Sequence, residues 1–412
     1  MAKKAADVIT RLSLLLGPFP QKELTLEPVH FGGAPRVARV QLGEIEASES
    51  LFRFAGDENL FPEALPRAIA EQWLLSDNLI KAKDAWLVRA LGAYAAWRYL
   101  LETNPAAAQV IVAEATRDTI GDLAYPLSDE RHPRGNSPPD NWIVRNERGM
   151  LVLRTLETAI DRERVDRVIP EMMHRAAGRP PSTELLEAVC EEVAKRKLSW
   201  FFDYFVRGRQ IPTIELRRLA SESPNVVAGE IVVKDFPTEG SLRVEMAVRT
   251  AQGIVEHSVA THGAVTPFTV NVPAPAQGIT LDPDLRILRW TDAARRSKAQ
   301  IAILAELPNP LTKDSLGAAI EVYRRALAAD ADDESRRAQS LRERLGELEW
   351  AHGDSEAALA DLEAAINGHS IAAFETYLCR AKAYLYHGVV LLHLGRAKEA
   401  REDARAGLAL PR

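Results

Sequence analysis

Two neighbouring stretches, LPRAIAEQWLLSDN (residues 65–78) and DAWLVRALGAYAAW (residues 84–97), decide the fold of this chain. In both, apolar residues recur every three or four positions, which is the spacing that places them on one face of an α-helix. We therefore expect two consecutive helices that bury these faces. The polar residues carried by the two helices then decide which chemistry the protein can perform.

The composition is that of a folded protein with more than one domain. The chain has 412 residues, of which 46% are hydrophobic and 27% are charged, and this excludes disordered and collagen-like classes. The net charge of −6 leaves no broad basic surface, so we expect no nucleic-acid partner. The chain has only two cysteines, and the run LSLLLG is too short for a signal core or a membrane span. We expect a cytoplasmic protein with no membrane partner.

The first half of the chain is predicted to be mostly helical, and we assign residues 1–208 to one domain. Two strand-like stretches, 23–31 and 36–45, come before most of the helices. The segment 128–141 combines Pro, Gly, Ser and Asn, which indicates a surface loop. Helical periods are predicted over residues 65–75, 85–102, 106–123, 150–160, 165–177 and 182–195.

The period changes to two between residues 211 and 290. Short runs of β-branched residues alternate with polar ones there, and Gly and Pro separate the runs. Five to seven short strands of this kind predict a small antiparallel β-sandwich, which we assign to residues 209–292.

Residues 305–412 return to helical periods with a repeat-like pattern that resembles tetratricopeptide repeats. Small and apolar residues fall at the expected places in two units: Leu345, Gly346, Gly353, Ala358, Leu362 and Ala365, and then Gly388, Leu391, Gly395, Ala400 and Ala404. The stretch AAIEVYRRALAAD resembles the second helix of an earlier unit. The units recur at irregular intervals, so an ordinary bundle of helical hairpins is the alternative. The resemblance implies a protein or peptide partner.

Six blocks lie in order along residues 9–290: LLLGPFP, AIAEQWLL, DAWLVRALGAYAAW, NERGMLVLRTLE, LSWFFDYFVRGRQIPTIEL and LDPDLRILRW. Together they resemble the M1-family aminopeptidases, which are gluzincin metallopeptidases. LLLGPFP resembles the turn into their catalytic domain, AIAEQWLL their zinc helix, and DAWLVRALGAYAAW the helix after it. NERGMLVLRTLE resembles the start of a later helix, LSWFFDYFVRGRQIPTIEL the passage into a β-sandwich, and LDPDLRILRW the end of that sandwich. The resemblance implies a mostly helical thermolysin-like (zincin) domain, with the repeats in the place of the family's C-terminal helical array. The expected fold class is thus multidomain α+β.

The residues that carry the chemistry in that family are different in this chain. A zinc helix needs histidines at i and i+4, because that spacing brings both imidazoles within reach of one ion. Aligned on the Gln-Trp pair that follows, Arg67 and Glu71 replace the two histidines and Ala68 replaces the glutamate that acts as general base. Arg89 replaces the third zinc ligand, a glutamate. Asn146 replaces the tyrosine that stabilises the tetrahedral intermediate.

These replacements predict a site with no metal and no other cofactor. Arginine has no lone pair to offer and stays protonated in proteins, so neither Arg67 nor Arg89 can be a ligand. Each would also repel a zinc ion, by roughly 8 kcal/mol at ~4 Å and an effective dielectric of ~20. The chain has no pair of histidines at i, i+4 spacing. We expect Glu71 to accept hydrogen bonds from one or both arginines instead, in an ion-pair cluster that joins the two helices.

The exopeptidase signature of the family, Gly-x-Met-Glu-Asn, has two partial matches. AGDEN (residues 55–59) keeps the acid and the amide but lies too near Arg67. FGGAPRVARVQL (residues 31–42) has the better spacing and strand context but lacks the acid. We interpret AGDEN as a chance match and the signature as lost.

Other candidates for chemistry are interpreted as structural. His132 lies in the Pro-rich loop and is expected to be solvated, and His174 is expected near a helix C-terminus, where it faces the dipole. Four aromatic residues are candidates for a cleft, but their helical spacing favours packing in the core: Trp73, Trp86, Tyr94 and Trp97.

Three hypotheses for the function follow. The first is a catalytically inactive M1-like protein that binds a protein or peptide partner through its C-terminal repeats. The second is an active zinc aminopeptidase whose site is unrecognised or is completed by another chain. The third is an unrelated hydrolase, for which the sequence offers no nucleophile elbow, no Gly-rich phosphate loop and no Ser/His/Asp set. We favour the first.

Overall fold

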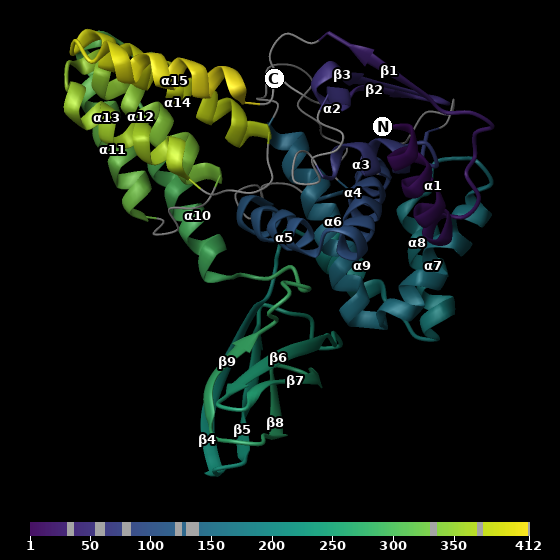
Figure 1. The fold of residues 1–412 in the computed structure, drawn as a ribbon. Helices are drawn as coiled ribbons and strands as arrows, with labels where there is room; N and C mark the ends of the chain where they lie inside the picture. The colour runs from purple at the N-terminus through teal and green to yellow at the C-terminus, as the bar shows by residue number, and fades with distance from the viewer. Residues whose placement is uncertain are drawn as a thin grey trace.

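The chain folds into a helical body, a β-sandwich and a C-terminal array of helices (Figure 1). This computed structural model describes residues 1–30, 37–53, 62–75, 84–119, 126–128, 140–329, 336–368 and 374–410. The architecture is multidomain α+β, as the changes of period predicted.

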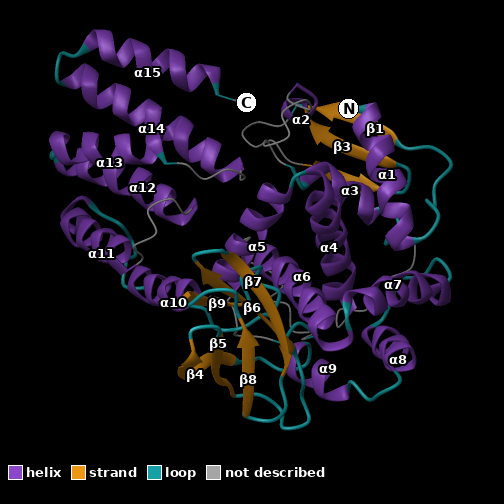
Figure 2. Ribbon diagram, turned by 60° about the horizontal axis from the view of Figure 1, so that its bottom comes forward, coloured by secondary structure: helices purple, strands orange, loops and turns teal. Residues whose placement is uncertain are grey.

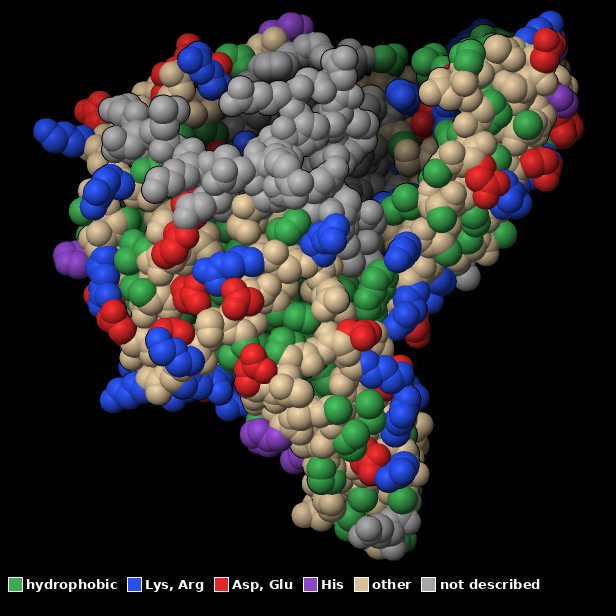
Figure 3. Space-filling model, turned by 180° about the vertical axis from the view of Figure 1, so that it is seen from behind, with side chains coloured by type: hydrophobic (Ala, Val, Ile, Leu, Met, Phe, Trp, Pro, Cys, Tyr) green, Lys and Arg blue, Asp and Glu red, His purple; other side chains and the backbone are tan. Residues whose placement is uncertain are grey.

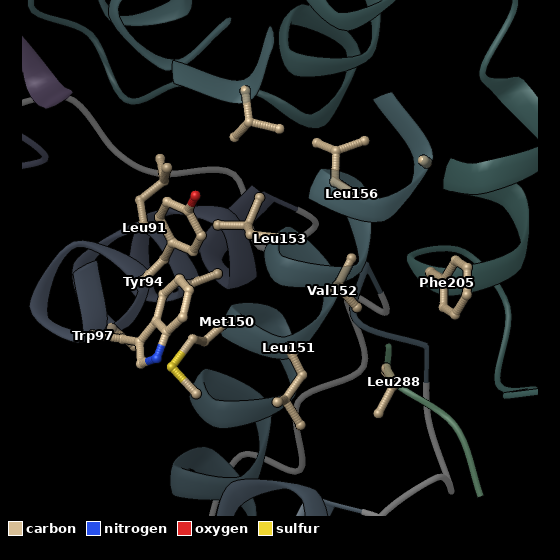
Figure 4. Packing of buried hydrophobic residues seen from close by; sticks show 14 of the residues in the cluster. Leu91, Tyr94, Trp97, Met150, Leu151, Val152, Leu153, Leu156, Phe205 and Leu288 are labelled. Carbon is tan, nitrogen blue, oxygen red and sulfur yellow. The ribbon is translucent and has the colours of Figure 1, made fainter. Parts of the chain in front are cut away.

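The helical body is built around two buried helices, α4 and α6. Helix α4 is apolar on nearly all sides, which is typical of a helix enclosed by others, whereas α6 buries several polar side chains among its apolar ones. The two helices pack against each other. Figure 4 shows Tyr94 and Trp97 of α4 beside Leu153 and Met150 of α6. The helices of the body are α1 (Ala2–Leu16), α2 (Glu49–Arg53), α3 (Ala64–Glu71), α4 (Ala85–Thr103), α5 (Pro105–Thr119), α6 (Asp140–Ile160), α7 (Arg162–Ala176), α8 (Thr183–Ala194) and α9 (Ser199–Phe205).

Helix α6 begins ten residues before the predicted helix, at the end of the stretch that was expected to be a loop. The sequence NWIVRNERG in its first turns is mostly polar and lacks a clear apolar period, so the pattern indicated only the second half of the helix.

A small sheet covers one end of α3. Its strands are β1 (Thr25–Val29), β2 (Val37–Gln41) and β3 (Glu44–Ser48), in the order β1-β3-β2, with β1 parallel and β2 antiparallel to β3. The single strand predicted over 36–45 is therefore wrong, because a turn divides that stretch into two strands. Gly43 makes the turn with a φ of 75°, a value that side chains disfavour.

The β-sandwich consists of two three-stranded sheets, β4-β5-β8 and β7-β6-β9, in which every pairing is antiparallel. Buried residues alternate with more exposed ones along β5, β6 and β8, and the buried ones form the core of the sandwich. The strands are β4 (Thr213–Ser223), β5 (Val226–Lys234), β6 (Arg243–Thr250), β7 (Gly253–Ala260), β8 (Val265–Asn271) and β9 (Ala276–Leu281).

The C-terminal array stacks consecutive helices one on the next (Figure 2). The helices are α10 (Asp292–Leu304), α11 (Leu316–Ala329), α12 (Arg336–His352), α13 (Ser355–Asn367), α14 (Phe374–His393) and α15 (Ala397–Ala409), with a short 3₁₀ helix at Lys313–Ser315. Helix α10 packs on α11 and on α5, so the array begins before residue 305 and touches the body. Gly353 and Gly395 have positive φ at the corresponding turns of the last two hairpins.

Apolar packing joins the body and the sandwich more closely than it joins the array to either. Buried residues of the body and the sandwich form one continuous hydrophobic cluster, whereas the array has separate clusters of its own. Among the described residues, no helix is both long and apolar enough to cross a membrane.

Candidate functional site

The five positions that the sequence analysis aligned with the zinc site of the M1 family lie on three helices, α3, α4 and α6. Helix α3 carries Arg67, Ala68 and Glu71, and α4, which carries Arg89, packs between α3 and α6. Asn146 lies in the second turn of α6, but its side chain is outside the described part of the structure. The fold therefore brings together the helices on which the sequence alignment placed the five residues.

The contact between α3 and α4 is closest at Gly92. A β-carbon at this glycine would lie 3.4 Å from Glu71 Cγ and 3.9 Å from Arg67 Cγ. Arg67 and Glu71 are one helical turn apart and share this face of α3, because residues at i and i+4 are neighbours on a helix surface. Their aliphatic stems therefore lie over Gly92.

The charged ends of Arg67 and Glu71 form an ion pair, with 3.8 Å between Nε and Oε1. That distance is longer than a hydrogen bond, so Arg67 is not a hydrogen-bond donor to Glu71 here. The prediction that Glu71 accepts from one or both arginines stays a prediction with respect to Arg89. The side chains remain 25% and 31% exposed, and water therefore competes for both. Arg89 on α4 completes a cluster of three charges, since its guanidinium interacts electrostatically with Glu71.

Burial dominates the ionisation of this cluster. It raises the pKa of Glu71, and the two arginines oppose that shift without reversing it. Burial also lowers the pKa of Arg89; Arg67 adds to this effect and Glu71 opposes it. Burial thus disfavours the charged forms of Glu71 and Arg89, although water still reaches the cluster, in which Arg89 is exposed.

The residues of this cluster do not fit a zinc ion. Glu71 is a single carboxylate that already faces Arg67, and the arginines offer no lone pair. Ala68, at the position of the general base, is buried and has no group that accepts a proton. Within the described residues, no group of three His, Cys, Asp or Glu side chains could hold a metal ion.

Gln72 and Trp73, just after α3, connect this helix to two other parts of the body. Gln72 bridges the β2–β3 turn: its Oε1 accepts from Gly43 N at 2.8 Å and its Nε2 donates to Gln41 O at 2.7 Å. Trp73 Nε1 lies 3.0 Å from the carbonyl oxygens of Gly17 and Pro18. The LLLGPFP turn thus contacts the helix that was aligned with the zinc helix.

Several residues singled out in the sequence lie outside the described part of the structure. They are the AGDEN stretch (55–59), most of the loop at 128–141 with His132, and the first half of FGGAPRVARVQL. His174 is exposed in the last turn of α7. The four aromatic residues proposed for the core, Trp73, Trp86, Tyr94 and Trp97, are all buried.

Sequence reasoning missed a pocket of about 700 Å³ between the helical body and the sandwich. Arg154 and Glu157 of α6 and Trp97 of α4 line it, although all three are nearly buried. The stretch LRTLETAI has polar residues at intervals typical of a surface helix, and the sequence does not indicate that a second domain covers them. The signal in the sequence that could have indicated the pocket was the polar face of this helix, which lies between strongly apolar stretches.

Comparison with models of known protein families found no match, and comparison with curated protein sequences found none either. Among solved structures, the chain is similar to Legionella pneumophila aminopeptidase A, determined in complex with aspartic acid, with a TM-score of 0.51 and 11% identity. The match covers 97% of this chain and 53% of that one, so this chain spans about half the length of the aminopeptidase. A match of this extent takes in the C-terminal array as well as the body and the sandwich. The fold of the chain is thus similar to that of an aminopeptidase.

Proposed function

We propose that the chain is a catalytically inactive relative of the M1 aminopeptidases that serves as a binding or scaffold module. The observation that carries the proposal is the cluster of Arg67, Glu71 and Arg89 across α3 and α4. A metallopeptidase needs three ligands that donate electron pairs and an open coordination position for water. This cluster offers one carboxylate and two cations, and Ala68 supplies no base.

The aminopeptidase-like fold is a second observation that supports the same proposal. The body and the sandwich share one apolar core, and the contribution of this packing to stability does not need a metal ion. Loss of the metal ligands from such a body removes chemistry and leaves a surface that can still present binding elements.

The C-terminal array is the proposed partner surface. Its last hairpin exposes large apolar side chains, with Leu385 and Leu408 each 63% exposed. Figure 3 shows hydrophobic side chains among charged ones along the array. Stacked helical hairpins offer an extended face to a peptide or a partner helix. We propose a protein or peptide partner, bound through tetratricopeptide-like repeats.

Metal content and peptidase activity together test the loss of catalysis. The purified full chain is dialysed against zinc and then against buffer, its zinc is measured by atomic spectroscopy, and hydrolysis of aminoacyl anilides is assayed with and without added zinc. We expect far less than one zinc ion per chain, and no hydrolysis above the rate in buffer alone. Stoichiometric zinc with turnover that a chelator abolishes would refute the proposal.

Affinity capture from the source organism tests the partner surface. The double variant Leu385→Ser, Leu408→Ser should lose the proteins that the wild-type chain retains, because it removes apolar contact area from the last hairpin. Leu14→Ser is the matched control, since Leu14 is a leucine 84% exposed on α1, far from the array in sequence. Equal capture by all three proteins would exclude this hairpin as the docking face.

A further inference from the structure

The pocket between the helical body and the sandwich is lined by both apolar residues and arginines. Its volume of about 700 Å³ falls in the range of small-molecule sites. Trp97, Leu101 and Val112 from α4 and α5 form the apolar wall. Arginines of α6, α7 and the sandwich also line it, and the guanidinium of Arg154 lies over the Trp97 ring.

The charges around this pocket do not balance. Six arginines line it against four acidic side chains. A fifth carboxylate outside the lining, that of Glu245, pairs with Arg286, which leaves an excess of one positive charge in a chain whose net charge is −6. Electrostatic fields are strongest in concave sites with walls of low dielectric constant. The pocket therefore attracts an anion, although the protein as a whole repels one.

One buried carboxylate serves several of these cations. The side chain of Glu157 is 1% exposed, and it accepts from Arg162 Nε at 3.1 Å and from Arg286 Nη2 at 3.3 Å. Its second oxygen accepts from Tyr94 Oη at 2.6 Å. Both oxygens of Glu157 are thus in use, and it has little capacity to neutralise a third guanidinium.

That third guanidinium belongs to Arg154, which is buried in the pocket wall. It lies 4.4 Å from the centre of the Trp97 ring and donates to the backbone oxygens of Leu285 at 2.7 Å and Asp284 at 2.8 Å. Its Nε is buried without a hydrogen-bond partner among the described residues. Burial lowers the pKa of Arg154 to about 10, because carbonyl oxygens compensate a cation less than a carboxylate does.

We propose that this pocket binds a small molecule with a phosphate group next to a short apolar or aromatic group. The excess of positive charge fits an anion, and arginine binds phosphate oxygens in a two-pronged geometry. The wall formed by Trp97, Leu101 and Val112 accommodates the apolar part. This site is separate from the Arg67, Glu71 and Arg89 cluster, and it does not depend on whether the chain is a peptidase.

Some of the arginines in the pocket also join the two domains, and a test of ligand binding has to separate that structural role from binding. Arg154, Arg243 and Arg286 each form a contact between the body and the sandwich. For example, Arg243 Nη1 lies 2.5 Å from Asp161 Oδ1. Arg167 does not join the domains: it lines the pocket, is exposed, and forms no hydrogen bond or ion pair with the described residues. Removing Arg167 leaves the domain boundary intact and removes one charge from the pocket.

Calorimetric titration of the full chain with phenyl phosphate tests the proposal. We expect saturable binding at one site that weakens with added salt, and markedly weaker binding of phenol, which lacks the charge. Arg167→Gln should weaken phenyl phosphate binding by about three- to fivefold, the size of one exposed charge interaction. Arg401→Gln removes the same charge from the exposed face of α15 and is the matched control.

A second variant probes the buried cation. Arg154→Met should reduce binding more than Arg167→Gln does, and its thermal unfolding shows whether it folds; if it does not fold, Arg167→Gln decides the question. Three results would overturn the proposal: no saturable heat at millimolar phenyl phosphate, equal loss in Arg167→Gln and Arg401→Gln, or phenol binding as tightly as phenyl phosphate.

Discussion

Two glycines at corresponding places in the last two hairpins should respond in opposite ways to the same substitution. At Gly346 in α12, a β-carbon would lie 2.5 Å from Leu362 Cγ and 3.1 Å from the carbonyl oxygen of Ala358. At Gly388 in α14, the nearest atoms, Ala400 O and Asp403 Cβ, are 3.6 Å away. The first glycine permits close helix packing, whereas the second has room for a methyl group.

The magnitudes follow from these distances. Overpacking at Gly346 costs about 1–3 kcal/mol, and the better helix propensity of alanine offsets about 1 kcal/mol of this. Gly346→Ala should therefore destabilise the α12–α13 hairpin by up to about 2 kcal/mol. Gly388→Ala meets only ordinary contacts and should stabilise the α14–α15 hairpin by up to about 1 kcal/mol.

Hydrogen exchange measured by mass spectrometry reports the local stability of each hairpin. Exchange of α12–α13 peptides should accelerate in Gly346→Ala, and exchange of α14–α15 peptides should slow in Gly388→Ala, by a factor of ten for each ~1.4 kcal/mol. Peptides from the sandwich serve as the internal control. If both variants accelerated exchange, or if Gly346→Ala slowed it, the close approach of α12 and α13 would be refuted.

Three further predictions concern the body. Arg89→Glu should lower the urea midpoint, because it places a second carboxylate near Glu71, and it should bind no zinc after dialysis; an unchanged midpoint would place Arg89 away from Glu71. Burial raises the pKa of Glu71 in the folded chain, so protonation favours folding, and the wild type should gain stability relative to Glu71→Gln as the pH falls from 7 towards 4.5. The opposite slope would show that the arginines dominate. Tyr94→Phe removes the 2.6 Å hydrogen bond to buried Glu157 and should cost about 1.5–3 kcal/mol in urea unfolding, whereas a change under ~0.5 kcal/mol would contradict that bond.

The sequence predicted the positions of most helices of the body, because their buried faces impose a period of 3.6 on the apolar residues. It also predicted the change to strands after residue 208, where the period becomes two. It missed the first half of α6 and the turn at Gly43. Both lie in stretches where polar residues interrupt the pattern, and the Gly43 turn is held in place by its tertiary contact with Gln72.

For the candidate site too, the sequence predicted one part and the tertiary structure decided another. Residue types alone were enough to argue that Arg67 and Arg89 cannot hold zinc, because a guanidinium has no lone pair wherever it lies. The distance within the Arg67 and Glu71 pair was not predictable from type. It depends on how α4 packs over the two stems at Gly92, which sets the exposure of the pair and its competition with water.

Only the tertiary structure brought the arginine-lined pocket together. Its residues come from α4, α5, α6, α7 and the sandwich, and they are far apart in sequence. The periodicity of a single segment does not predict such long-range contacts. They arise where two domains share one apolar core and bury the polar face of α6 between them. The helical and strand periods determined what each segment is, and the packing of segments against one another decided which charges must share a buried space.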